Sequence, residues 1–83
     1  MKKLAGYGTD DHPAGDPERP QVAWSVVAID DCDRCGDLRI ELTVEELGRP
    51  GTGVVGHLAP GTARTIRAML ALALRDMGED AGA

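Results

Sequence analysis

Two cysteines stand three residues apart in an acidic stretch, and they are the residues of this chain best suited to chemistry. The stretch from Asp30 to Asp37 reads Asp-Asp-Cys-Asp-Arg-Cys-Gly-Asp, with sulfurs at Cys32 and Cys35. Two thiolates at this spacing can reach one tetrahedral metal ion, and the following glycine permits a positive φ that turns backbone donors toward sulfur. The pattern makes Cys32 and Cys35 candidate zinc ligands.

The Cys-x-x-Cys-Gly sequence, at the tip of a predicted hairpin, resembles one half of a zinc-ribbon motif over about eight residues. The resemblance implies a zinc knuckle. The chain has no second cysteine pair, so we expect a second subunit to complete the site with its own two sulfurs. A tight turn at Pro50-Gly51 would put His57 more than about 20 Å from the tip, at about 3.3 Å per strand residue. His12 could reach the sulfurs only from a flexible arm.

The same stretch allows other interpretations. A redox-active dithiol needs nearby cations to favour thiolate, whereas aspartates surround these sulfurs. Asp31, Asp33 and Gly36 match the first, third and sixth positions of an EF-hand calcium loop, but Leu42 stands where that loop requires Glu. The remaining alternative is a polar hairpin tip with two reduced thiols, in which the aspartates favour the turn.

A single segment, Leu58 to Met77, is long and periodic enough to bury a continuous helical face. At 100° per residue its apolar side chains fall within an arc of about 140°. We expect this arc to be the core side of a helix that starts near Pro60 and ends at Gly78. The arc consists of Ala63, Ile66, Met69, Leu70, Ala73, Leu74 and Met77.

Three strands are predicted ahead of the helix. Residues 21–29 are nearly all β-formers and apolar on both faces, whereas residues 38–45 alternate strictly between apolar and polar. Pro50-Gly51 suits a type II turn, and residues 52–58 form the third strand. The order β-β-β-α predicts an α+β fold, a three-stranded antiparallel β-meander packed on one C-terminal helix.

The two ends of the chain are expected to lie outside this domain. Residues 1–20 hold three Pro, three Gly and no hydrophobic period, which predicts a disordered N-terminal arm. Residues 79–83 should fray. The domain is therefore expected to span residues 21–78.

The charge and the motifs of the chain limit the classes of function that it is expected to have. A net charge of −5 argues against general affinity for nucleic acid, and no apolar run approaches the roughly 20 residues of a membrane span. No motif places a nucleophile beside a base or forms a phosphate-binding loop, so we do not expect an enzyme. The chain is expected to be cytoplasmic, where the cysteines would stay reduced.

These observations favour a small non-catalytic module that binds another protein. About 60 residues make a marginal core, so we expect a homodimer that associates through the strand at 21–29 or through the helix. The candidate contact residues are Trp24, Val27 and Ile29 on the strand and Leu72 on the helix. The alternative is the zinc knuckle that uses Cys32 and Cys35.

A further alternative comes from the order of elements. The β-β-β-α order is similar to that of integrase-type and plant AP2-type DNA-binding domains, which implies a sheet that enters the major groove. The outward face of the second strand, however, shows Glu41 and Glu45 beside a single Arg39. Those acidic groups disfavour contact with phosphates.

Overall fold

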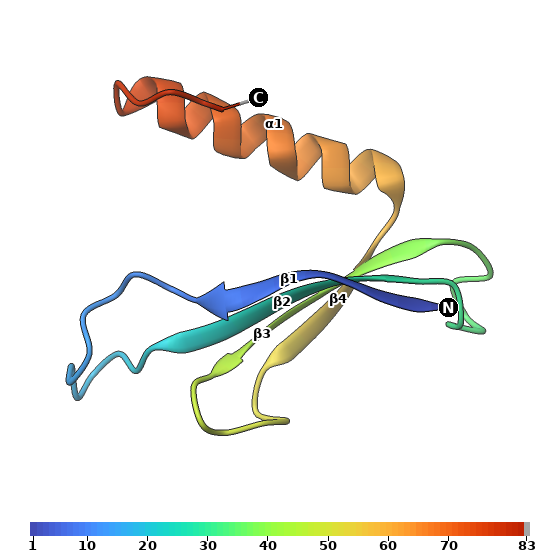
Figure 1. The fold of residues 1–83 in the computed structure, drawn as a ribbon, viewed down its shortest axis with the longest axis horizontal. Coiled ribbons are helices and arrows are strands. Elements are labelled where there is room, and N and C mark those ends of the chain that lie inside the picture. The colour runs from blue at the N-terminus through green and yellow to red at the C-terminus, as the bar shows by residue number, and fades with distance from the viewer. Residues whose placement is uncertain (83) are drawn as a thin grey trace.

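The computed structural model describes residues 1–82 and shows four antiparallel strands followed by one helix (Figure 1). The strands lie in the sheet in chain order. The small α+β class is confirmed, but the sheet has four strands and not three. The elements are β1 (Lys2–Thr9), β2 (Val22–Ile29), β3 (Arg39–Glu46), β4 (Val54–Leu58) and α1 (Pro60–Asp76).

The additional strand, β1, lies in the segment that was predicted to be a disordered arm. Two of its glycines, Gly6 and Gly8, stand opposite Val26 and Trp24 of β2. The Trp24 ring lies against Gly8, where an added Cβ would come within 2.9 Å of the ring, and the indole N–H donates to the Thr9 carbonyl at 3.2 Å. The prediction was wrong because glycines that normally weaken a strand are here covered by an aromatic ring on the neighbouring strand.

The position of β2 inside the sheet bears on the predicted mode of self-association. Its backbone pairs with β1 on one side and with β3 on the other, and the edges of the sheet are β1 and β4. The segment 21–29 therefore has no free backbone edge for pairing with another subunit, and any contact it made would have to use its side chains.

The β3–β4 connection contains the predicted turn but is longer than predicted. Pro50 and Gly51 occupy the centre of a turn in which Gly51 has φ 83° and the Thr52 N–H donates to the Arg49 carbonyl at 3.3 Å, as a type II turn requires. A second turn precedes it, where Gly48 has φ 79°. The two turns together delay the start of β4 to Val54 and shift its register on β3.

Helix α1 begins with Pro60 in its first turn, and a single residue, Ala59, separates it from the end of β4. It ends at the predicted glycine: Gly78 has φ 79°, its N–H donates to the Arg75 carbonyl, and the next N–H, of Glu79, donates to Leu74. This is a Schellman motif. Residues 79–82 have no regular structure, and residue 83 of the predicted frayed end lies outside the described residues.

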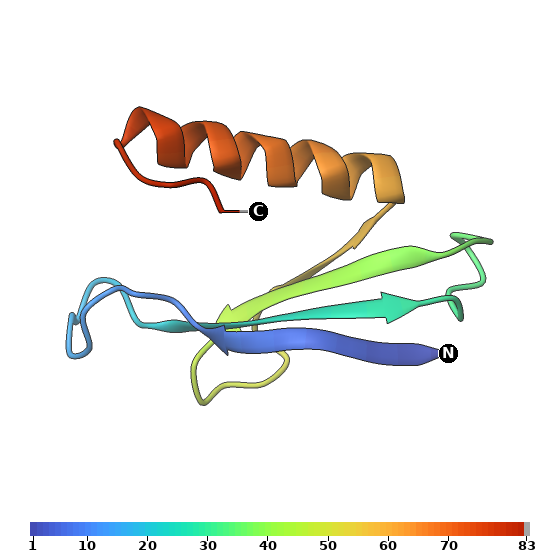
Figure 2. The same ribbon diagram turned by 45° about the horizontal axis from the view of Figure 1, so that its top comes forward.

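The helix lies over one face of the sheet but does not pack along the whole of that face (Figure 2). It approaches only β3 and β4 and contains no buried residue. The sheet face below it lacks side chains at Gly6 and Gly56, so little fills the space between the layers. The predicted core between helix and sheet is therefore not formed within one chain. Ile29, 2% exposed, is the one buried hydrophobic residue among residues 1–82, and it lies on the opposite face.

Candidate metal centre

The connection between β2 and β3 holds both cysteines and curls back on itself. Gly36 has φ 69°, and its N–H donates to the Cys32 carbonyl at 3.1 Å. The Arg39 guanidinium donates to the Cys35 carbonyl at 3.3 Å and fixes the far side of the turn. Because only glycine takes such a φ without strain, the Cys-x-x-Cys-Gly order makes a turn that brings the two sulfurs together.

His57 is the third member of the cluster. It lies on β4 opposite Glu41 of β3, close to the end of the sheet from which the cysteine turn projects. Its Nδ1 is 3.3 Å from the Cys35 sulfur, and one ligand atom from each of Cys32, Cys35 and His57 lies within 4.8 Å of the others. The predicted separation of more than about 20 Å was wrong.

The error has two physical causes. The prediction paired His57 with Val44, whereas the longer β3–β4 connection pairs Val44 with Val54 and brings His57 three residues closer to the turn. The cysteine turn also curls and does not extend the line of the strands. A longer β3–β4 connection alone would not have placed the histidine at the sulfurs, because the curl of the cysteine turn is also needed.

Glu41 supports the histidine from the neighbouring strand. The Glu41 carboxylate lies 3.6 Å from Nε2 of His57, the ring nitrogen that points away from the sulfurs. Histidines that bind metals commonly direct their second nitrogen at a carboxylate, which fixes the ring and increases its basicity. The sequence analysis had noted Glu41 only as an acidic residue on the outer face of the sheet.

The two thiols differ in acidity. A hydrogen bond from the Cys35 side chain, with smaller help from His57, lowers the pKa of Cys32 below its ordinary value. The same bond to Cys32, with some desolvation, raises the pKa of Cys35. Cys32 is therefore the more acidic of the two thiols.

The distance between Cys35 and His57 is near what zinc requires. Zinc binds sulfur at about 2.3 Å and imidazole nitrogen at about 2.0–2.1 Å in a tetrahedron, so a bound sulfur and nitrogen are about 3.6 Å apart. The observed 3.3 Å between Cys35 and His57 is close to this value. Within residues 1–82 the cluster offers three ligands, which leaves a fourth position for water or for a group from another molecule.

The structure places the other predicted site residues elsewhere. His12 lies in the connection between β1 and β2, at the other end of the sheet, where it pairs with Asp16 at 2.9 Å. Ile29 is buried within the chain, and Val27 is half-buried on the same face. Trp24 and Leu72 are exposed.

No family model matches this chain, and comparisons with curated proteins and with solved structures likewise gave no match. In the part of the chain that the structure describes, no helix combines the length and the apolar character that a membrane crossing needs. The function is therefore argued from the site itself.

Proposed function

We propose that this protein binds one zinc ion per chain through Cys32, Cys35 and His57. The observation that carries the proposal is the approach of an imidazole on β4 to two sulfurs in the β2–β3 turn, with ligand atoms within 4.8 Å of one another. Segments 22 residues apart in sequence supply these groups. The fold therefore brings together metal-binding groups that are distant in the sequence.

The ligand types favour zinc over other common metals. Thiolates are soft ligands that select zinc, copper(I) and iron–sulfur clusters, whereas calcium and magnesium require oxygen. A set of two sulfurs and one nitrogen occurs in zinc sites of both structural and catalytic kinds. A cytoplasmic location, as the sequence predicts, would keep both sulfurs reduced and available.

The metal would fasten the β2–β3 turn to the edge strand β4. The structure gains little from burial, because among its described residues Ile29 is the one buried hydrophobic side chain. Small domains without a sufficient core are commonly stabilised by a metal or by association. We therefore assign the ion a structural role, in a non-catalytic module whose fourth metal position can accept a ligand from a partner.

The test is metal analysis of untagged protein purified without chelator. We expect about one zinc per chain, and the cobalt-substituted protein should show the charge-transfer and ligand-field absorption of a tetrahedral site with two sulfurs. Zinc at 100 times its dissociation constant would stabilise the fold by about 2.7 kcal/mol. For a domain of this size that corresponds to a rise in Tm of roughly 10–20 °C.

Three variants identify the ligands. Cys32→Ser and His57→Ala should each weaken zinc binding strongly, whereas His12→Ala, which changes the other histidine of the chain, should bind like the unmodified protein. Loss of binding in Cys32→Ser with full retention in His57→Ala would refute the site and would favour a four-sulfur site shared between two subunits. Metal-free protein with a Tm that zinc does not change would refute metal binding altogether.

A further inference from the structure

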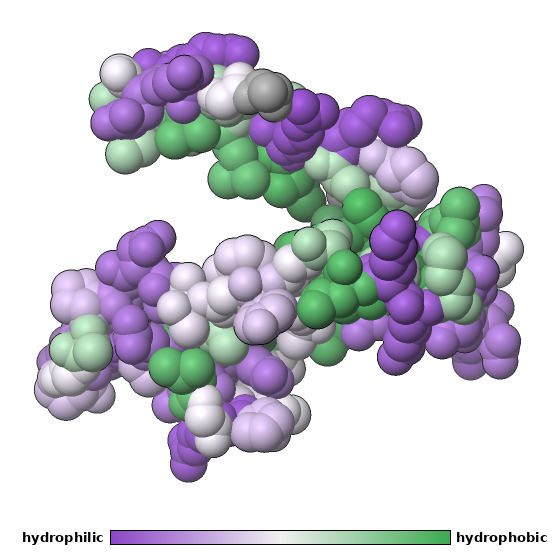
Figure 3. Space-filling model, viewed as in Figure 1, coloured by the Kyte–Doolittle hydropathy of each residue, from purple (hydrophilic) through white to green (hydrophobic). Residues whose placement is uncertain are grey.

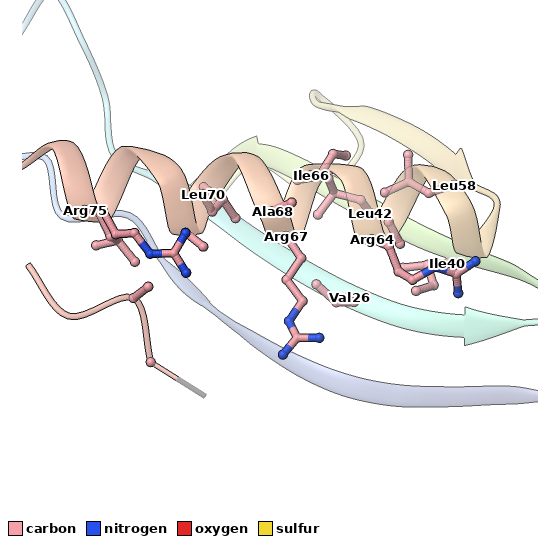
Figure 4. Close-up of a pocket in the computed structure, with 15 residues that line it drawn as sticks. Val26, Ile40, Leu42, Leu58, Arg64, Ile66, Arg67, Ala68, Leu70 and Arg75 are labelled. Carbon is pink, nitrogen blue, oxygen red and sulfur yellow. The ribbon is translucent and has the colours of Figure 1, made fainter.

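A groove of about 690 Å³ lies between α1 and the sheet face that it covers (Figure 4). Figure 3 shows hydrophobic side chains along the side of α1 that faces this hollow and, on the sheet, near the point where the two layers meet. Its walls are apolar, apart from arginines on the helix. The sheet contributes Val26, Ile40, Leu42 and Leu58, and the helix contributes Ile66, Leu70 and Leu74.

The apolar arc of the helix is only partly turned toward this groove. Ile66 and Leu74 are half-buried, but Met69, Leu70 and Met77 are 64%, 62% and 75% exposed. An amphipathic helix usually buries its apolar face on a neighbouring layer. Here the groove and the exposed part of the arc, which meet at Leu70, form one continuous apolar surface.

The chain exposes far more surface than a folded monomer of its mass should. Its accessible area is 6438 Å². A monomer of 8.7 kDa is expected to expose about 4,700 Å². The radius of gyration is 14.8 Å, against about 12 Å for a compact domain of this length. The excess area, about 1,700 Å² per chain, is on the scale that each subunit of an obligate homodimer buries.

We propose that a second copy of this chain covers the groove, in a symmetric dimer that buries the helix arc and the sheet face below it. A twofold contact uses the same patch on both copies, so one self-complementary apolar surface suffices. The contact surface consists of Val26, Ile40 and Leu42 of the sheet and Ile66, Met69 and Leu70 of α1.

A small apolar ligand could fill the groove but would leave Met69 and Met77 exposed, whereas a second copy can cover the groove and the arc together.

The test is sedimentation equilibrium of the full-length chain between about 1 and 200 µM, with two variants compared. Leu70→Glu puts a charge in the proposed contact and should weaken dimerisation at least about tenfold. Val55→Glu is the matched control, because Val55 is 56% exposed and pairs with Thr43, on the face of the sheet opposite the groove. It should dimerise like the unmodified protein.

Each outcome decides the proposal. A monomer at every concentration overturns it, as does dimerisation that Val55→Glu impairs and Leu70→Glu does not. Should Leu70→Glu fail to fold, mixed dimers of isotope-labelled and unlabelled wild-type protein decide: intermolecular NOEs from Leu70 methyls to Val26 or Leu42 support the contact, and their absence overturns it.

The dimer is independent of the metal site, and the same experiment shows this. His57 and Glu41 lie on the sheet face opposite the groove, since Glu41 stands between the groove-lining Ile40 and Leu42 on β3. Dimers should therefore persist after chelation. Dissociation on chelation of a chain that keeps its circular-dichroism spectrum would overturn the groove contact and point to a metal shared between subunits.

Discussion

Replacing Glu41 by Gln should weaken zinc binding without removing a ligand. The Glu41 carboxylate lies 3.6 Å from Nε2 of His57 and is the charged group that orients the imidazole. Removal of such a supporting carboxylate typically costs 10–100-fold in metal affinity. Because the distance exceeds a hydrogen bond and the Glu41 side chain is 24% exposed, water screens the interaction and we expect the lower end, about tenfold.

The measurement is competition for zinc between the protein and a chromophoric chelator at pH 7.5. Glu45→Gln is the matched control, since Glu45 lies on the same strand and face but four residues farther along it, and its carboxylate accepts from the Gly51 N–H instead. A zinc affinity of Glu41→Gln within twofold of both the unmodified protein and the control would refute the assigned role of the carboxylate.

Two further predictions concern the segment 1–20. Gly8→Ala should displace the Trp24 ring and break its hydrogen bond, which should lower the free energy of unfolding by about 1–2 kcal/mol in a denaturant titration. Gly6→Ala is the control and should cost less, because its added Cβ would lie 4.0 Å from the ring. Equal effects of the two variants would contradict this packing. The hydrogen bond from His12 lowers the pKa of Asp16. The contribution of this contact to the stability of the fold is therefore present above the ordinary Asp pKa and is lost as the pH falls through the lowered pKa of Asp16. NMR titration should show this pKa rise in His12→Ala, and an unchanged value would exclude the contact.

Local sequence rules predicted most of the elements. Alternation located β3, β-propensity located β2, and glycine and proline located the type II turn and the helix end. Each of these features depends on residues within a few positions of one another. The sulfur pair of the metal site belongs to the same class, because Cys32 and Cys35 share one turn.

Features set by long-range partners were missed. Strand β1 forms because Trp24, more than a dozen residues later, covers Gly8. His57 reaches the sulfurs because of a register that two consecutive turns determine together. In both cases the deciding contact joins residues far apart in sequence, and neither composition nor periodicity carries that information.

The scarcity of buried side chains has a calorimetric consequence. The heat capacity of unfolding arises from apolar surface that becomes hydrated, at about 12–15 cal/mol/K per residue for ordinary compact domains. A chain whose described residues bury Ile29 and no other hydrophobic side chain has little such surface to release. If calorimetry gives the full heat-capacity change of an 83-residue domain, the additional apolar surface must be buried between molecules. The melting temperature would then rise with protein concentration.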